Sequence, residues 1–191
     1  MKNVKNVKNL SITNSDSEQS ETEEESFNDS EKPIKYKNLL KEIVDILDTI
    51  ILSNKKNKKI HKESSPFFNE NIPKISLYDY LLRIRKYSGI GNSTFIISLI
   101  YIDRICTKKG IILSKYNIHR LLFTSILVAI KYNEDTTYEY FYYSEIAGIS
   151  VKELSTLEST FLKFIDFELF VQEKAYKRYY TFLLYNNKLK E

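Results

Sequence analysis

The sequence predicts an all-α protein with a single globular domain. Its 191 residues include 4 glycines and 3 prolines, so few positions favour a tight turn. Between these positions apolar residues recur at helical spacing, and small polar residues stand where helices would begin. A chain of this length can bury one core of ordinary size, with little room for a second.

The first segment, residues 1–33, is expected to be a disordered acidic tail. Between Ser11 and Glu31 there are eight acidic residues, no basic residues and very few apolar ones. Such a composition cannot bury enough apolar surface to offset the entropy lost on ordering. We therefore exclude this segment from the predicted fold.

Residues 34–53 change to the pattern of an amphipathic helix, which we place at about 36–52. Its apolar positions repeat at helical spacing with charged residues between them. A lysine-rich linker is then expected over residues 54–71. Its lysine run, 55–62, is read as a solvated linker, as a signal for nuclear import or as a nucleic-acid contact.

Five helices are predicted in the following hundred residues, with another after them. Ser76 and Ser150 each precede an acidic residue by three positions, which is the form of a capping box. Asn92 or Ser93, and Ser114, are candidates for the same role. The predicted helices span about 76–88, 92–107, 114–133, 141–148, 150–165 and 174–186.

The segment 118–132 is expected to be the central helix. Its apolar residues cover nearly every side of a helix, yet it is far too short to span a bilayer. Such a helix must be surrounded by other helices. Helix 150–165 instead carries one apolar stripe with Glu158 along its edge.

The inventory of reactive residues argues against an enzyme. The chain has a single cysteine, Cys106, and two histidines far apart, so neither a disulfide framework nor a metal-ligand spacing is present. No Gly-rich phosphate loop or hydrolase motif occurs. We expect no cofactor and no metal. Without a secretory leader or a long apolar stretch, the protein is expected to be intracellular, in the nucleus, the cytoplasm or both.

Several motifs occur in one order between residues 72 and 170. They include LIYIDR at 99–104, AIKY at 129–132 and LESTFL at 157–162. This stretch resembles the cyclin box of the P/U-type cyclins. The resemblance implies a five-helix box with flanking helices, the last within residues 171–191. It also implies a regulatory subunit that binds a cyclin-dependent protein kinase as a heterodimer and activates it.

The resemblance also assigns residues to the kinase contact. Lys131 and Glu158 match the family residues that reach the kinase. Their neighbours Glu134 and Asp135 could engage basic residues near its activation segment, or simply lie in a solvated loop. The apolar residues that match the family's contact are Val128, Tyr132, Leu162, Phe167 and Leu169.

One further pair is predicted to be structural. Asp103 lies among apolar residues of its helix and needs a partner if it is buried. Arg83, which matches a family arginine, is the candidate for a buried ion pair.

Simpler interpretations exist for these residues. Lys131 could be a solvated cation that stabilises the end of its helix, and Glu158 an ordinary exposed acid. Another function is also open, that of a cyclin-fold nucleic-acid-binding module like those of basal transcription factors. The mixed charge of the box disfavours nucleic acid, and no membrane partner is expected. The MRAIL docking motif and any R-x-x-L sequence are absent.

Overall fold

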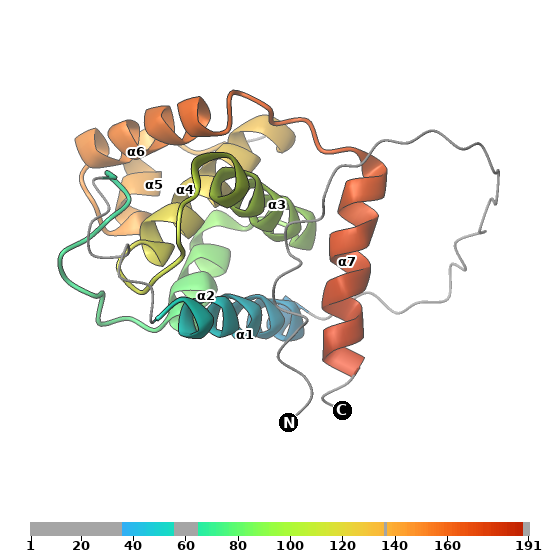
Figure 1. Cartoon of the computed structure of the whole chain (residues 1–191). Helices are drawn as coiled ribbons and strands as arrows, with labels where there is room; N and C mark the ends of the chain where they lie inside the picture. The colour runs from blue at the N-terminus through green and yellow to red at the C-terminus, as the bar shows by residue number, and fades with distance from the viewer. Residues whose placement is uncertain (1–35, 56–64, 136, 189–191) are drawn as a thin grey trace.

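The computed structural model of the chain describes residues 36–55, 65–135 and 137–188, and in these residues it contains helices and no strands (Figure 1). The predicted acidic tail, and the lysine run of the predicted linker except for its first residue, lie outside them. The helices are α1 (Tyr36–Asn54), α2 (Leu77–Ser88), α3 (Asn92–Lys109), α4 (Ile118–Asn133), α5 (Tyr140–Ala147), α6 (Val151–Phe164) and α7 (Glu173–Lys188). The all-α prediction is confirmed.

Helix α4 is the centre of the bundle, as its all-round apolar pattern predicts. Nearly every residue from Leu121 to Ile130 is buried, including the small polar Thr124 and Ser125. Helices α2, α3 and α6 pack around it. The hydroxyls of Thr124 and Ser125 donate to the carbonyls of Arg120 and Leu122, so no polar group of these two side chains is buried without a partner.

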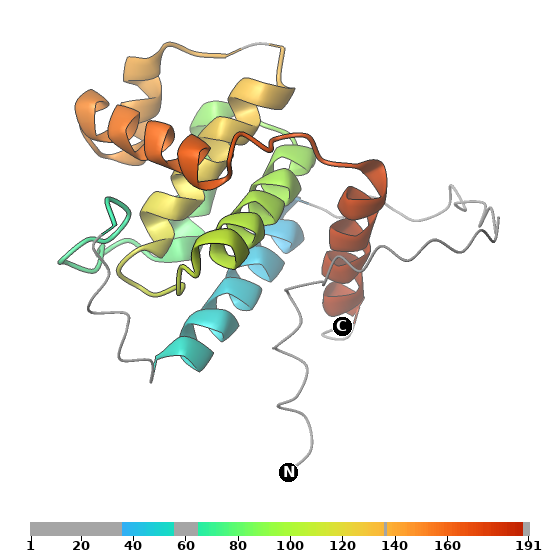
Figure 2. The same ribbon diagram turned by 45° about the horizontal axis from the view of Figure 1, so that its top comes forward.

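Helices α1 and α7 flank this core and lie beside each other in both views (Figures 1 and 2). The apolar stripe of α1 faces inward, with Leu39, Leu40 and Ile43 essentially buried. Helix α1 packs on α2 and α7, and α7 also packs on α3. The stripe is therefore covered by the protein itself. None of the helices in the described residues is both long and apolar enough to cross a membrane.

Two of the predicted helix caps are confirmed and two are wrong. The hydroxyls of Ser76 and Ser150 accept hydrogen bonds from the backbone N–H groups three residues later, at 3.0 and 3.1 Å. Helix α3 instead follows Gly91, without a side-chain cap. Helix α4 begins four residues later than expected, because Ser114 starts a turn in which the side chain of Asn117 binds the backbone.

Residues 65–71 do not belong to a flexible linker, contrary to the prediction. Phe67 is completely buried and packs on two rings of α6, edge-on to Phe161 at 6.2 Å between centroids and tilted to Phe164 at 6.1 Å. A pair of aromatic residues between turn residues has no periodicity, so the burial of Phe67 could not be predicted from a pattern.

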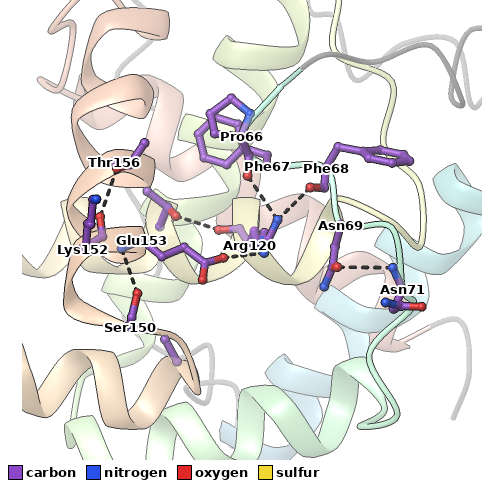
Figure 3. A network of polar contacts seen from close by, with 12 residues as sticks. Pro66, Phe67, Phe68, Asn69, Asn71, Arg120, Ser150, Lys152, Glu153 and Thr156 are labelled. Atoms are coloured by element: carbon purple, nitrogen blue, oxygen red, sulfur yellow. Dashed lines mark hydrogen bonds and ion pairs between the residues drawn. The ribbon is translucent and has the colours of Figure 1, made fainter.

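Arg120 of α4 fixes this segment from the other side (Figure 3). Its guanidinium donates to the carbonyls of Pro66 and Phe68, at 3.3 and 2.7 Å. It also forms an ion pair with Glu153 of α6. One planar group with several N–H donors thus joins the segment to α4 and α6.

Candidate functional site

Lys131 and Glu158 lie together on the surface where α4 ends against α6. Lys131 is in the last turn of α4, and its Nζ is 2.7 Å from Oε1 of Glu158. The side chain of Lys131 is 43% exposed and that of Glu158 is 14% exposed. The two predicted contact residues therefore form an ion pair in which the Lys131 ammonium is more exposed to solvent than the Glu158 carboxylate.

The ring of Tyr140 lies beneath this pair. Its centroid is 5.1 Å from Nζ of Lys131, which is within the range of a cation–π contact. Burial raises the pKa of the Tyr140 hydroxyl, and the neighbouring Glu158 carboxylate raises it further. Tyr140 consequently stays neutral, and the ammonium is held between a carboxylate and a ring face.

An exposed aromatic segment follows the end of α6. Asp166 and Phe167 both have φ of 56°, in the left-handed region that L-residues other than glycine seldom adopt. The N–H of Phe167 donates to the carbonyl of Leu162 at 3.0 Å and closes the helix. The side chains of Phe167 and Phe170 are 66% and 70% exposed. The chain thus accepts an unfavourable backbone conformation and turns two large apolar groups toward solvent.

Helix α3 holds this segment from below through hydrogen bonds to its backbone. The hydroxyl of Tyr101 donates to the carbonyl of Leu169 at 2.7 Å. The guanidinium of Arg104 donates to the carbonyls of Glu168 and Phe170, at 2.7 and 3.0 Å. Each bond satisfies a loop carbonyl that has no helical partner.

Lys108, at the end of α3, adds ion pairs to these hydrogen bonds. Its Nζ lies 3.0 Å from Oδ2 of Asp166 and 2.8 Å from Oε2 of Glu168, and it donates to the carbonyl of Ile165 at 3.2 Å. These carboxylates raise the pKa of Lys108, and Lys108 holds the pKa of Asp166 below its usual range. We call Tyr101, Arg104 and Lys108 the α3 clamp.

The other predicted contact residues have different environments. Tyr132 is half exposed, whereas Leu162 and Leu169 are partly buried against the core. Val128 is 2% exposed, so its predicted place at the surface is wrong. It lies one turn before Tyr132 on the inner side of α4, where it supports the surface from within.

Glu134 and Asp135 also differ from each other. The Glu134 carboxylate accepts a hydrogen bond from the hydroxyl of Thr94, in the first turn of α3, where negative charge is favourable. Asp135 is exposed. Glu134 therefore has a structural role within the protein, whereas the side chain of Asp135 faces solvent.

The predicted ion pair between Arg83 and Asp103 does not form. Arg83 donates to the carbonyl of Glu145, in α5, at 2.7 Å. Asp103 faces α7 and accepts a hydrogen bond from the hydroxyl of Tyr179 at 2.8 Å. The prediction failed because α3 packs on α7, whereas α2 packs on α1, α4 and α5, so the partner of Asp103 comes from outside the box.

Sequence reasoning missed the α3 clamp and Phe170. Tyr101 and Arg104 stand in the LIYIDR motif, but the motif does not reveal what they bind. Their acceptors lie more than 60 residues away along the chain. The exposure of Phe170 depends on the turn at Asp166 and Phe167, which no residue preference indicated.

An all-α bundle around one buried helix, with a lysine–glutamate pair where that helix ends, is the arrangement that the family resemblance implies. The chain belongs to the cyclin family, because the family model described as Cyclin matches residues 2–169.

Individual relatives place it among the P/U-type cyclins. It is 32% identical to Cyclin-U4-1 of Arabidopsis thaliana over 157 residues, which cover 80% of this chain and 78% of that protein. It is 35% identical to PHO85 cyclin-7 of Saccharomyces cerevisiae over 129 residues, covering 61% of this chain and 45% of that protein. To Cyclin-P3-1 of Oryza sativa subsp. japonica it is 33% identical over 123 residues, 64% of this chain and 52% of that protein.

Proposed function

We propose that this cyclin is the regulatory subunit of a cyclin-dependent protein kinase and activates it through the surface where α4 and α6 end. The observation that carries the proposal is the Lys131–Glu158 pair, with the exposed Phe167 just past the end of the helix that carries Glu158. Glu158 is followed one helical turn later by Leu162, and the backbone of Phe167 is bonded to Leu162. We call the surface from Lys131 and Glu158 through Leu162 to Phe167 the strip, and take it as the contact with the kinase.

Such a strip suits a helix of a partner kinase. Exposed aromatic side chains are typical of the centre of a protein interface, and charged groups are typical of its rim. Protein kinases need an ion pair between a strand lysine and a glutamate of a movable helix before ATP and magnesium are correctly held. A cyclin that binds the active position of this helix shifts its population without joining the chemistry.

The α3 clamp has a clear use in this proposal. A partner binds more tightly to a surface that is already ordered, because less conformational entropy is lost on association. The clamp holds the backbone on both sides of Phe167 and so prepares the ring for contact. Asp135 and Tyr132 extend the same surface from the end of α4.

The arginines give little support to the nucleic-acid alternative. Four of them, Arg83, Arg85, Arg104 and Arg120, donate hydrogen bonds to backbone carbonyls of the protein itself. A nucleic-acid-binding face would instead turn such groups toward phosphates and bases. We therefore retain the kinase partner.

The test is binding to a panel of recombinant cyclin-dependent kinases, with phosphorylation of a peptide substrate as the readout. The full chain should bind and activate one or more of them. Phe167→Ala and Tyr132→Ala should weaken binding by about tenfold each, as expected for buried aromatic contacts.

Controls on other surfaces make the result specific. Leu52→Ala in α1 and Tyr185→Ala in α7 remove side chains that are equally exposed but remote from the strip. They should leave binding unchanged. Failure of the wild-type chain to bind any kinase would overturn the proposed function, and equal losses in all four variants would overturn the proposed surface.

A further inference from the structure

A cavity of about 330 Å³ lies where α1, α3 and α7 meet. Helix α7 lies beside both α1 and α3 (Figures 1 and 2). The walls of the cavity are mostly aliphatic, with Ile46 and Ile50 from α1, Leu99 and Ile102 from α3, and Leu183 from α7. A volume of this size, lined in this way, is at the small end of ligand pockets in proteins.

Among the described residues that line this cavity, Asp103 is the one that carries a charge. Its Oδ2 accepts the hydrogen bond from the Tyr179 hydroxyl, whereas Oδ1 has no hydrogen-bond partner among the described residues. Burial raises the pKa of Asp103, and the nearby positive charge of Arg104 counteracts this to a smaller extent. A partly buried carboxylate with one oxygen still open to a partner is stabilised by a donor or a cation.

Two other polar residues of the wall, Asn54 and Tyr179, fit the same chemistry. The side-chain N–H of Asn54 is used by the carbonyl of Leu113, at 3.2 Å. The Tyr179 oxygen donates its proton to Asp103 and can still accept a hydrogen bond. An N–H group placed between Oδ1 of Asp103 and the Tyr179 oxygen would therefore find two acceptors.

We infer that this cavity binds a small molecule with a compact apolar body and an ammonium head. The head would lie at Asp103 and Tyr179, and the body would fill the aliphatic space between α1 and α7. Charge complementarity selects this class, because the lining residues that the structure describes include a carboxylate and no cation. The site is independent of the kinase surface and does not rest on the proposed function.

Asp103 also has a structural use, since its bond to Tyr179 joins α3 to α7. The variant Asp103→Asn separates the two roles. Its amide oxygen can still accept from the Tyr179 hydroxyl, but the negative charge is lost. Ligand selectivity, in contrast to folding, should therefore change in this variant.

The experiment is a calorimetric titration of the full chain at neutral pH with three probes of one shape: 1-adamantylamine, 1-adamantanol and 1-adamantanecarboxylate. The amine should bind most tightly and the carboxylate should not bind. Asp103→Asn should weaken the amine by about tenfold or more, since a charge-assisted hydrogen bond is lost, and should leave the alcohol nearly unchanged.

Two further measurements locate the binding. Ile50→Trp would fill the cavity with an indole ring in place of a smaller aliphatic side chain. It should abolish binding of both the amine and the alcohol, with helical content unchanged. Cys106 is the single cysteine of the chain and lies in the wall of the cavity. The amine should therefore slow the alkylation of its thiol by iodoacetamide.

Several results would overturn the inference. Absence of binding heat for all three probes would show that the cavity admits no ligand of this class. Equal affinities for the amine and the alcohol, or an amine affinity that Asp103→Asn leaves unchanged, would remove the role of the carboxylate. Undiminished binding to a folded Ile50→Trp variant would place the probe elsewhere. The comparison of the three probes on the wild-type chain decides the matter even if a variant fails to fold.

Discussion

The bond between Asp103 and Tyr179 leads to opposite predictions for two substitutions at one position. Asp103→Ala removes the acceptor and leaves the Tyr179 hydroxyl without a partner among apolar residues of the cavity wall. An unsatisfied group of this kind costs about 1–3 kcal/mol. For a chain of this size the midpoint of thermal unfolding should fall by about 2–12 °C.

Asp103→Asn should behave differently, because it retains an acceptor and removes a charge that the site disfavours. Burial raises the pKa of Asp103 above its ordinary value of 3.8, so the folded protein holds this proton more tightly than the unfolded chain. The resulting stabilisation is complete below the unfolded pKa and is lost as pH rises through the folded pKa. At pH 7 the asparagine variant should therefore be at least as stable as the wild type.

The assay is thermal unfolding followed by circular dichroism between pH 7 and pH 4. The advantage of Asp103→Asn over the wild type should shrink as the pH falls toward 4, because the wild-type carboxyl then becomes protonated. A loss of stability at pH 7 as large as that of Asp103→Ala, independent of pH, would refute this reasoning. It would mean that the ionised carboxylate is itself stabilising.

Two more predictions concern the α3 clamp and the segment before α2. Lys108→Ala should weaken kinase binding by about threefold to tenfold, because its bonds to Ile165, Asp166 and Glu168 are lost. Lys109→Ala loses one weak contact at 3.4 Å and should have little effect. Equal affinities of the two variants in a binding titration would contradict a positioning role. Phe67→Ala should lower the free energy of unfolding, measured by urea titration, by about 3–5 kcal/mol, because it empties a completely buried site against α6. A decrease below about 1 kcal/mol would show that the segment is not part of the core.

The fold was predictable wherever one local pattern decides the structure. The position of α4 follows from apolar residues on all its sides, since such a helix is stable only inside a bundle. The caps at Ser76 and Ser150 follow from residues three apart. Asn117 was missed because an asparagine side chain can bind either a helix terminus or a turn, and its neighbours decide which.

The site was predictable only in part, because its geometry depends on contacts between distant parts of the chain. Lys131 and Glu158 were named from the family resemblance, but their direct ion pair joins residues 27 apart. The partner of Asp103 is 76 residues away, on a helix outside the box. Val128 was predicted to lie at the contact surface but is buried. In a helix that is apolar on all sides, the sequence pattern does not indicate which apolar residues face solvent.

The central claim is that the Lys131–Glu158 pair contacts a kinase. The double substitution of Lys131→Glu with Glu158→Lys reverses the charges and preserves the possibility of an internal ion pair, so helical content and thermal midpoint should remain close to those of the wild type. A partner group matched to the original charges would then meet the wrong sign, which typically costs about 2–5 kcal/mol.

The most direct measurement is the dissociation constant of this double variant for the kinase that the wild-type chain activates. It should rise by roughly thirty-fold or more, with activation lost in parallel. Reversal of the surface pair Glu173–Lys177 on α7, which also has an Nζ–Oε1 distance of 2.7 Å, provides the matched control and should leave the constant unchanged. A folded Lys131→Glu, Glu158→Lys variant that binds and activates the kinase as well as the wild type would contradict the account.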